Sequence, residues 1–350
     1  MKKKDKTWLN IVGLLVFLLF LPLFFRMGGG QIAMAEVLPG QAAAEGLSLS
    51  ALFEKEEKAV VSANLNTIGV DDVEFSKALA VSAGGRPLGV SAEELTKMKD
   101  LQYLRSNYYI VDSRTSLLSG DIDVEQALSL DLTIEKTKQE PKVLIFHTHI
   151  HEGFADSDMS KGLSEGIWGV GEELKRILEE EYGIGVIHDG GQYDMVNGKG
   201  QTTGAYERME PPIREILKKY PSIEVCIDLH RDGVAEGTRL VTEIDGRKCA
   251  QVMFFNGLCR LNKNGTPQAI SGLENPYLKE NLAFSLQMKT AANQLYPDFT
   301  RKIYLNAYRF SLHFMPRSTL VEVGAQTNTK AEARNAMKPL AQVLASVLTE

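Results

Sequence analysis

The chain has 350 residues, of which 44% are hydrophobic and 24% are charged, and its formal net charge is −6. This length is sufficient for one large domain or two smaller ones. Nucleic acid is excluded as an expected partner, because phosphate contacts require clustered Lys and Arg and no long basic run follows the N-terminus.

The N-terminal segment has the composition of a membrane anchor. Lysines at positions 2, 3, 4 and 6 precede an uncharged stretch from 7 to 25, close in length to the roughly 20 residues that span a hydrocarbon core. We expect residues 1–27 to be a single membrane-spanning anchor, with the lysines in the cytoplasm and the rest of the chain outside it. The motif Ala33-Met34-Ala35 leaves cleavage of a signal peptide after Ala35 as the alternative.

Two regions without candidate catalytic or metal-binding residues follow. Residues 28–49 are rich in Gly, Ala and Ser and lack periodicity, which is typical of a tether. Residues 50–135 have a mixed pattern and no histidine, so we expect a smaller α+β region that positions the rest of the chain or docks a partner. Within it, Ser91 and Glu94 have capping-box spacing, and residues 108–112 resemble a short strand.

Residues 136–350 alternate between short apolar strands and amphipathic helices. Strands are predicted over 143–146, 185–188, 224–230 and 318–324, and helices over 170–182, 211–220, 280–296 and 330–348. This alternation predicts an α/β fold with a mostly parallel sheet flanked by helices. We expect this region to be the catalytic domain.

Three of these predicted strands end in side chains that bind metals or move protons. The groups are His147, His149 and Glu152 after the first; Asp228, His230, Arg231 and Asp232 at the end of the second; and Glu322 in the third. The C-terminal ends of parallel strands share one edge of a sheet, so these groups are expected to converge.

The spacing of His149 and Glu152 is that of a metal-binding H-x-x-E unit. Together with His230 it gives two imidazoles and one carboxylate, a set that suits catalytic zinc and leaves one position for water. His147 lies on the same side as His149 if the strand continues past Phe146, so His147 is the alternative ligand.

Acidic and basic neighbours suggest further roles. Glu322 is expected to take a proton from the attacking water and pass it to the leaving nitrogen, with a structural ion pair as the alternative. Asp228 or Asp232 is expected to orient the ring of His230. Arg231 is suited to holding a carboxylate or an oxyanion, and equally to pairing with a nearby acid.

At these residues the chain resembles the stage II sporulation protein P family of endospore-forming bacteria. The matching segments include His147-Thr148-His149 with Glu152, the run from Asp228 to Asp232, and the run from Leu320 to Gly324. The resemblance covers residues 108 to the C-terminus. Where family members usually have Glu-Ser-Tyr, this chain has Glu152-Gly153-Phe154, which keeps the glutamate but changes the neighbouring wall of the site.

The resemblance implies a zinc-dependent N-acetylmuramoyl-L-alanine amidase of peptidoglycan that also has endopeptidase activity. It further implies an amidase-type α/β fold and partnership with stage II sporulation proteins D and M, at the septal or engulfing membrane of a sporulating cell. Two alternatives remain: a metallocarboxypeptidase-like enzyme, which also uses H-x-x-E with a distant His, and a non-catalytic scaffold that binds the cell wall.

Overall fold

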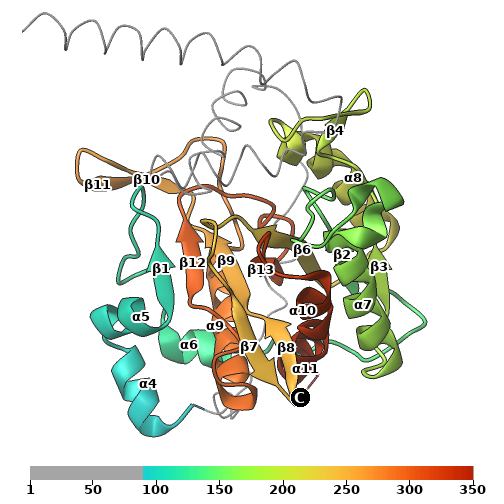
Figure 1. The fold of residues 1–350 in the computed structure, drawn as a ribbon. Coiled ribbons are helices and arrows are strands. Elements are labelled where there is room, and N and C mark those ends of the chain that lie inside the picture. The colour runs from blue at the N-terminus through green and yellow to red at the C-terminus, as the bar shows by residue number, and fades with distance from the viewer. Residues whose placement is uncertain (1–89, 350) are drawn as a thin grey trace, which may run out of the picture.

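The computed structural model describes residues 90–349 (Figure 1). The predicted anchor (1–27), the tether (28–49) and the first part of the 50–135 region lie outside the described residues. Across residues 90–349, no helix combines the length and the apolar composition that crossing a bilayer requires.

A seven-stranded sheet forms the centre of the fold (Figure 1). Its strands lie in the order β1 (Tyr109–Val111), β12 (Ile303–Asn306), β9 (Val252–Gly257), β13 (Ser318–Ala325), β6 (Val225–Asp232), β2 (Val143–Phe146) and β3 (Val186–His188). Every neighbouring pair is parallel except β9 with β13. The prediction of a mostly parallel sheet is therefore confirmed, and the C-terminal ends of β13, β6, β2 and β3 lie at one edge.

Helices cover one face of this sheet. They are α6 (Val124–Ser129), α7 (Ile167–Glu180), α9 (Leu278–Leu295), α10 (Lys330–Asn335) and α11 (Met337–Leu348). Alternate strand residues such as Val143, Ile145, Ile227 and Val321 share one large apolar core with these helices. Strands that are covered on both faces are expected to be buried along their whole length. Every residue of β2 and β6 is buried, including the polar residues at the end of β6.

The opposite face is covered in two parts. Helix α8 (Ala205–Lys219) packs over Leu144, Phe146 and Cys226 of β2 and β6. Over β9 and β13 lies a second apolar cluster, to which the segment 307–312 contributes and which includes Phe255 and Leu320. Side chains on this face near the end of β6 and β13 therefore lie between α8 and the segment 307–312.

The described part of the 50–135 region shares this core. Strand β1 extends the sheet by pairing with β12, and Gln287 of α9 donates hydrogen bonds of 2.8 Å to the carbonyls of Ala127 in α6 and of Leu130 at its C-terminal end. Ser91 caps α4 (Ala92–Met98), but the carboxylate of Glu94 accepts hydrogen bonds from two tyrosines instead of completing a capping box. Residues 90–135 thus belong to the same packed unit as the sheet.

Two predicted helices differ from the observed ones. Helix α8 begins at Ala205 and not at Pro211, and it continues through both prolines. Burial explains this: Ala205, Met209 and Ile213 recur every four residues on the buried side, whereas Pro211 and Pro212 are exposed. The single helix predicted over 330–348 is divided at Ala336 into α10 and α11.

The remaining elements are short. They are α5 (Leu101–Asn107), η3 (Met159–Lys161), η4 (Leu163–Glu165), and the hairpin pairs β4 (Met195–Val196) with β5 (Lys199–Gly200), β7 (Val241–Ile244) with β8 (Arg247–Ala250), and β10 (Arg260–Lys263) with β11 (Thr266–Ala269).

Candidate metal centre

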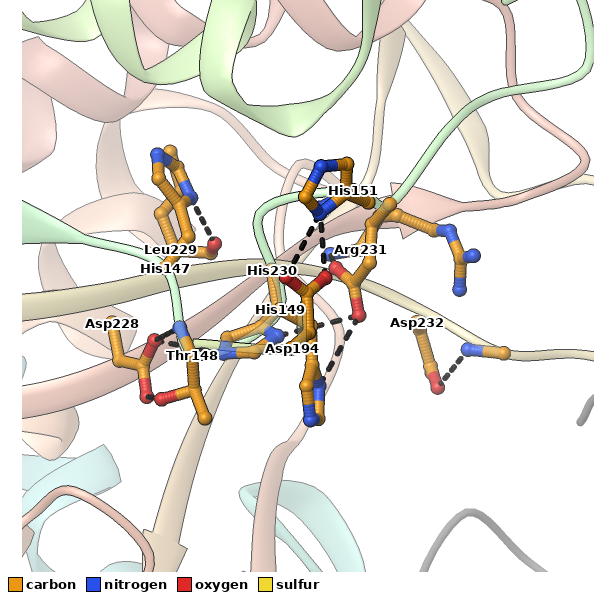
Figure 2. A network of polar contacts seen from close by, with 12 residues as sticks. His147, Thr148, His149, His151, Asp194, Asp228, Leu229, His230, Arg231 and Asp232 are labelled. Atoms are coloured by element: carbon orange, nitrogen blue, oxygen red, sulfur yellow. Dashed lines mark hydrogen bonds and ion pairs between the residues drawn. The ribbon is translucent and has the colours of Figure 1, made fainter. Parts of the chain in front are cut away.

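The three predicted strand ends meet at one edge of the sheet. In the parallel register, Glu322 of β13 lies opposite His230 of β6, and Phe146 at the end of β2 lies opposite Asp228. The turn that follows β2 therefore begins beside the last residues of β6. Figure 2 shows the histidines of this turn beside the side chains from the end of β6.

His149, Glu152 and His230 form a group in which one ligand atom from each residue lies within 4.8 Å of the others. The Oε1 atom of Glu152 is 3.7 Å from Nδ1 of His149 and 3.4 Å from Nδ1 of His230. The Oε2 atom accepts a hydrogen bond of 2.9 Å from the backbone N–H of Arg231, which fixes the carboxylate between the two rings. Glu152 and His230 are 78 residues apart in the sequence, yet the two imidazoles share this one carboxylate.

The donor set fits zinc by its chemistry. Two imidazole nitrogens and one carboxylate are the ligands of many catalytic zinc sites. Burial opposes ionisation of Glu152, but the charge of His230 and hydrogen bonds from His149 and His230 bring its pKa well below the ordinary value. The carboxylates of Asp228 and Glu152 outweigh burial and raise the pKa of His230 well above its ordinary value. The negative charge gathered here is what a cation would neutralise in place of the proton on His230.

Asp228 orients the ring of His230. The Nε2 atom of His230 donates to Oδ1 of Asp228 over 2.7 Å, which leaves Nδ1 facing Glu152. Asp228 also accepts from the backbone N–H of Thr148 (2.9 Å), the hydroxyl of Thr148 (2.8 Å) and the hydroxyl of Ser311 (2.7 Å). A carboxylate that holds one ring nitrogen of a histidine while the other faces the metal position is common behind protein-bound zinc, because it fixes the tautomer.

Glu322 is a buried carboxyl group, 3% exposed, on the strand next to His230. Its Oε2 atom has no hydrogen-bond partner among the described residues. Burial, the charge of Asp232 and the charge of Glu152 raise the pKa of Glu322 well above its ordinary value, against the opposing charges of His230 and Arg301. Among residues 90–349 no cation lies within ion-pair distance of Glu322, which speaks against a structural ion pair and leaves a group that can exchange protons as the reading to test.

His147 lies apart from this group. The strand ends at Phe146 and a turn follows, so alternation does not place His147 and His149 on the same side. The Nδ1 atom of His147 donates to the carbonyl of Leu229 over 2.6 Å, and Nε2 is 2.7 Å from Nε2 of His188. Burial lowers the pKa of His147 to about 3. Both ring nitrogens are therefore occupied, and His149 is the histidine beside Glu152.

Two of the predicted neighbours have other contacts. Asp232 pairs with Arg301 at 2.6 Å and accepts from the backbone N–H of Gly233, so it does not orient His230. The guanidinium of Arg231 donates through Nε to the carbonyl of Gly153 at 3.0 Å. Asp228 is therefore the carboxylate that orients His230. Arg231 stabilises the turn that carries Glu152 by its hydrogen bond to Gly153.

Sequence reasoning missed several residues of the site. Thr148 and Ser311 hold Asp228, and the ring of Tyr206 lies edge-on to His149 with centroids 5.9 Å apart. His151 pairs through Nδ1 with the buried Asp194 at 2.8 Å (Figure 2). Thr148 could have been found from its place between two histidines. Ser311 and Asp194 have no signal in the sequence, because only the tertiary fold brings them near.

Comparison with known proteins gives one family. The family model for Stage II sporulation protein P (SpoIIP) matches residues 84–345. A comparison with curated proteins finds no match.

Several solved structures are similar to this chain. They include the apo form of the N-acetylmuramyl-L-alanine amidase Ami1 from Mycobacterium abscessus (9% identity, TM-score 0.36, covering 59% of this chain and 99% of that chain). Others are the CwlD amidase from Clostridioides difficile in complex with the GerS lipoprotein (12%, 0.35, 59% and 98%) and an N-acetylmuramoyl-L-alanine amidase from Clostridium difficile 630 (12%, 0.34, 59% and 96%).

Proposed function

Because this chain belongs to the stage II sporulation protein P family, we propose that it is a zinc-dependent hydrolase of peptidoglycan. The bond cleaved is the amide between N-acetylmuramic acid and the L-alanine of the stem peptide. Cleavage of peptide cross-links by the same site is a second activity of this proposal.

One observation carries the proposal. His149, Glu152 and His230 offer two imidazoles and one carboxylate within 4.8 Å, and a buried, raised-pKa glutamate lies on the adjoining strand. A ligand set with a neighbouring proton acceptor is what hydrolysis of an unreactive amide requires. A purely structural zinc site would use four protein ligands and would not need Glu322.

The residues of the chain have distinct tasks in this mechanism. His149, Glu152 and His230 would hold the metal, which when bound supplies a Lewis acid for the scissile carbonyl and for water. Glu322 accepts the proton of the attacking water and delivers it to the leaving nitrogen of L-alanine. Its buried position keeps bulk water from competing for that proton. Asp228 keeps His230 in one tautomer throughout.

The place of action also belongs to the proposal. Residues 1–27 would anchor the enzyme in the cytoplasmic membrane, and residues 28–49 would tether a catalytic region outside it, next to the wall. Stage II sporulation proteins D and M would be its partners at the engulfing membrane. The region 50–135 would position the catalytic region or dock one of these partners.

The test uses the purified full-length chain and isolated cell-wall sacculi. Zinc is measured by elemental analysis, and digestion products are identified by mass spectrometry. An amidase releases stem peptides that begin with a free L-alanine amine and leaves the lactyl carboxylate on the glycan. The matched control is Glu322→Gln, which keeps the shape and the ligands but removes the proton acceptor.

The products separate the alternatives. Release of the terminal residue of the stem peptide alone would identify a carboxypeptidase-like enzyme. Cleavage of cross-links without free L-alanine amines would identify an endopeptidase only. If the wild type binds the wall but holds no zinc, and neither it nor Glu322→Gln releases a product, the enzymatic proposal is refuted in favour of a wall-binding scaffold.

A further inference from the structure

A buried serine that lies 83 residues from Asp228 in the sequence contacts the candidate metal centre. Ser311 lies in the segment between β12 and β13 and is 2% exposed. Its hydroxyl donates to Oδ2 of Asp228 over 2.7 Å, and Asp228 in turn holds His230. No step of the proposed mechanism uses Ser311.

The bonds on Asp228 are divided between its two oxygens. Oδ1 receives His230 and the backbone N–H of Thr148, while Oδ2 receives the hydroxyls of Thr148 and Ser311. A carboxylate with donors on both oxygens cannot rotate about its Cβ–Cγ bond without breaking several hydrogen bonds at once. Ser311 therefore helps to keep Oδ1 aimed at His230.

The backbone that delivers Ser311 is in an unusual conformation. Phe310 has a φ of 53°, in the left-handed region that bulky side chains rarely adopt. Such a conformation persists only where the surroundings enforce it. The ring of Phe310 packs edge-on against Phe255, with centroids 4.7 Å apart, and against Tyr206, at 5.6 Å. These contacts hold the turn in the form that directs Ser311 toward Asp228.

The same turn also reaches the second histidine. Tyr206, which packs against Phe310, lies edge-on to His149 at 5.9 Å. One dipeptide thus supports both imidazoles of the candidate centre, His230 through Ser311 and Asp228, and His149 through Phe310 and Tyr206. A purely structural turn would not need both connections.

We infer that the Phe310-Ser311 turn positions the two metal-binding histidines, with Ser311 a positioning residue that acts on His230 through Asp228. The inference rests on the proposed zinc site. Removing the hydroxyl leaves Oδ2 of Asp228 with one donor, so the ring of His230 loses part of its alignment. The metal affinity then falls while the ligands themselves remain.

The test compares Ser311→Ala, Ser311→Thr and Ser285→Ala in the full-length chain. Ser285 is a matched control: it is also fully buried and hydrogen-bonded, to Asn256, but it lies in α9 away from the site. Zinc affinity is measured by competition with a chromogenic chelator, and the visible spectrum of cobalt-loaded protein reports ligand geometry. We expect Ser311→Ala to weaken zinc binding by about 3- to 10-fold, less than loss of the orienting carboxylate itself.

The outcomes are distinct. A weaker affinity and a shifted cobalt spectrum in Ser311→Ala, with recovery in Ser311→Thr and no change in Ser285→Ala, support the inference. Wild-type affinity and spectrum in Ser311→Ala overturn it while leaving the zinc hydrolase intact. Equal losses in Ser311→Ala and Ser285→Ala also overturn it, because they indicate a general effect on stability. A wild-type chain that binds no zinc refutes the proposed function, and the inference falls with it.

Discussion

His230 donates its Nε2 proton to Asp228, two residues earlier on the same strand, over 2.7 Å. Side chains two apart on a strand lie on one face, so β6 itself supplies both the ligand and the group that aims it. Since Nε2 is committed to Asp228, only Nδ1 is left to face Glu152 and a metal. The short D-L-H spacing therefore places the ligand and its orienting carboxylate on one face of one strand.

Replacing Asp228 by Asn should weaken zinc binding by about 10- to 100-fold, the usual cost of losing an orienting carboxylate. The amide has one acceptor oxygen, so the variant loses either the pair of donors on Oδ1, which includes His230, or the two hydroxyl donors on Oδ2. Affinity is measured by competition with a chelator. Asp121→Asn, a buried carboxylate paired with Arg260, is the remote control and should leave affinity unchanged. Equal affinities in wild type and Asp228→Asn would refute this role.

His149→Ala should abolish zinc binding, whereas His147→Ala should lower stability and leave zinc binding intact. His149 lies beside Glu152, so its loss removes a ligand and the protein should no longer retain zinc after dialysis. His147→Ala should retain zinc but lower the free energy of unfolding by about 2–3 kcal/mol, because it leaves a cavity and the carbonyl of Leu229 unpaired. Elemental analysis and denaturant unfolding measure the two effects. Loss of zinc in His147→Ala alone would reverse the assignment.

Glu322→Gln should abolish turnover without releasing the metal. The amide cannot accept the proton of water, and removal of a general acid–base group typically costs about 10²- to 10⁴-fold in rate. Because Glu322 is buried and its pKa is raised, the neutral amide should be tolerated and the variant should be at least as stable as the wild type. The measurements are product release from sacculi, zinc content and thermal unfolding. Undiminished turnover would leave Glu322 without a catalytic role.

The sequence predicts the parallel sheet and the meeting of the site residues at one of its edges, because both follow from local patterns. Apolar runs that end in His149, His230 and Glu322 place these groups at one edge once the strands are parallel. The choice between His147 and His149 depends on where β2 ends, and the turn over residues 148–151 has no signature in the apolar run that precedes it. Ser311 is beyond any pattern, because its contact with Asp228 spans 83 residues.

Gly171→Ala should destabilise the fold. A Cβ atom on Gly171 of α7 would lie 2.7 Å from Nε2 of His188 and 3.0 Å from Nε2 of His147. Both rings are held by hydrogen bonds and cannot withdraw freely, so we expect a loss of about 1–3 kcal/mol in the free energy of unfolding. Gly120→Ala is the control, since a Cβ there meets nothing within 4 Å. Equal stability of the two variants would contradict the close packing of α7 on the histidine pair.

Stability should fall in mild acid because of His188. Burial lowers the pKa of His188 to about 4, against an ordinary value of 6.5, and its side chain is only 1% exposed. Between these two values the unfolded chain binds a proton that the folded chain does not, so this contribution is fully present above pH 6.5 and is lost as the pH falls toward 4. The slope is up to about 1.4 kcal/mol per pH unit, which amounts to about 3 kcal/mol over the whole interval.

The measurement is the free energy of unfolding in denaturant at several pH values from 7 to 4. Other groups also titrate there, so the comparison is with His188→Gln, which keeps a polar side chain but cannot gain a proton. The wild type should lose stability more steeply than the variant below pH 6.5. Glu172 approaches Nδ1 of His188, but its carboxylate is 44% exposed and solvent screens its charge. If the free energy of unfolding falls equally with pH in both proteins, Glu172 keeps His188 protonated in the folded state. Burial would then not be what sets the pKa of His188.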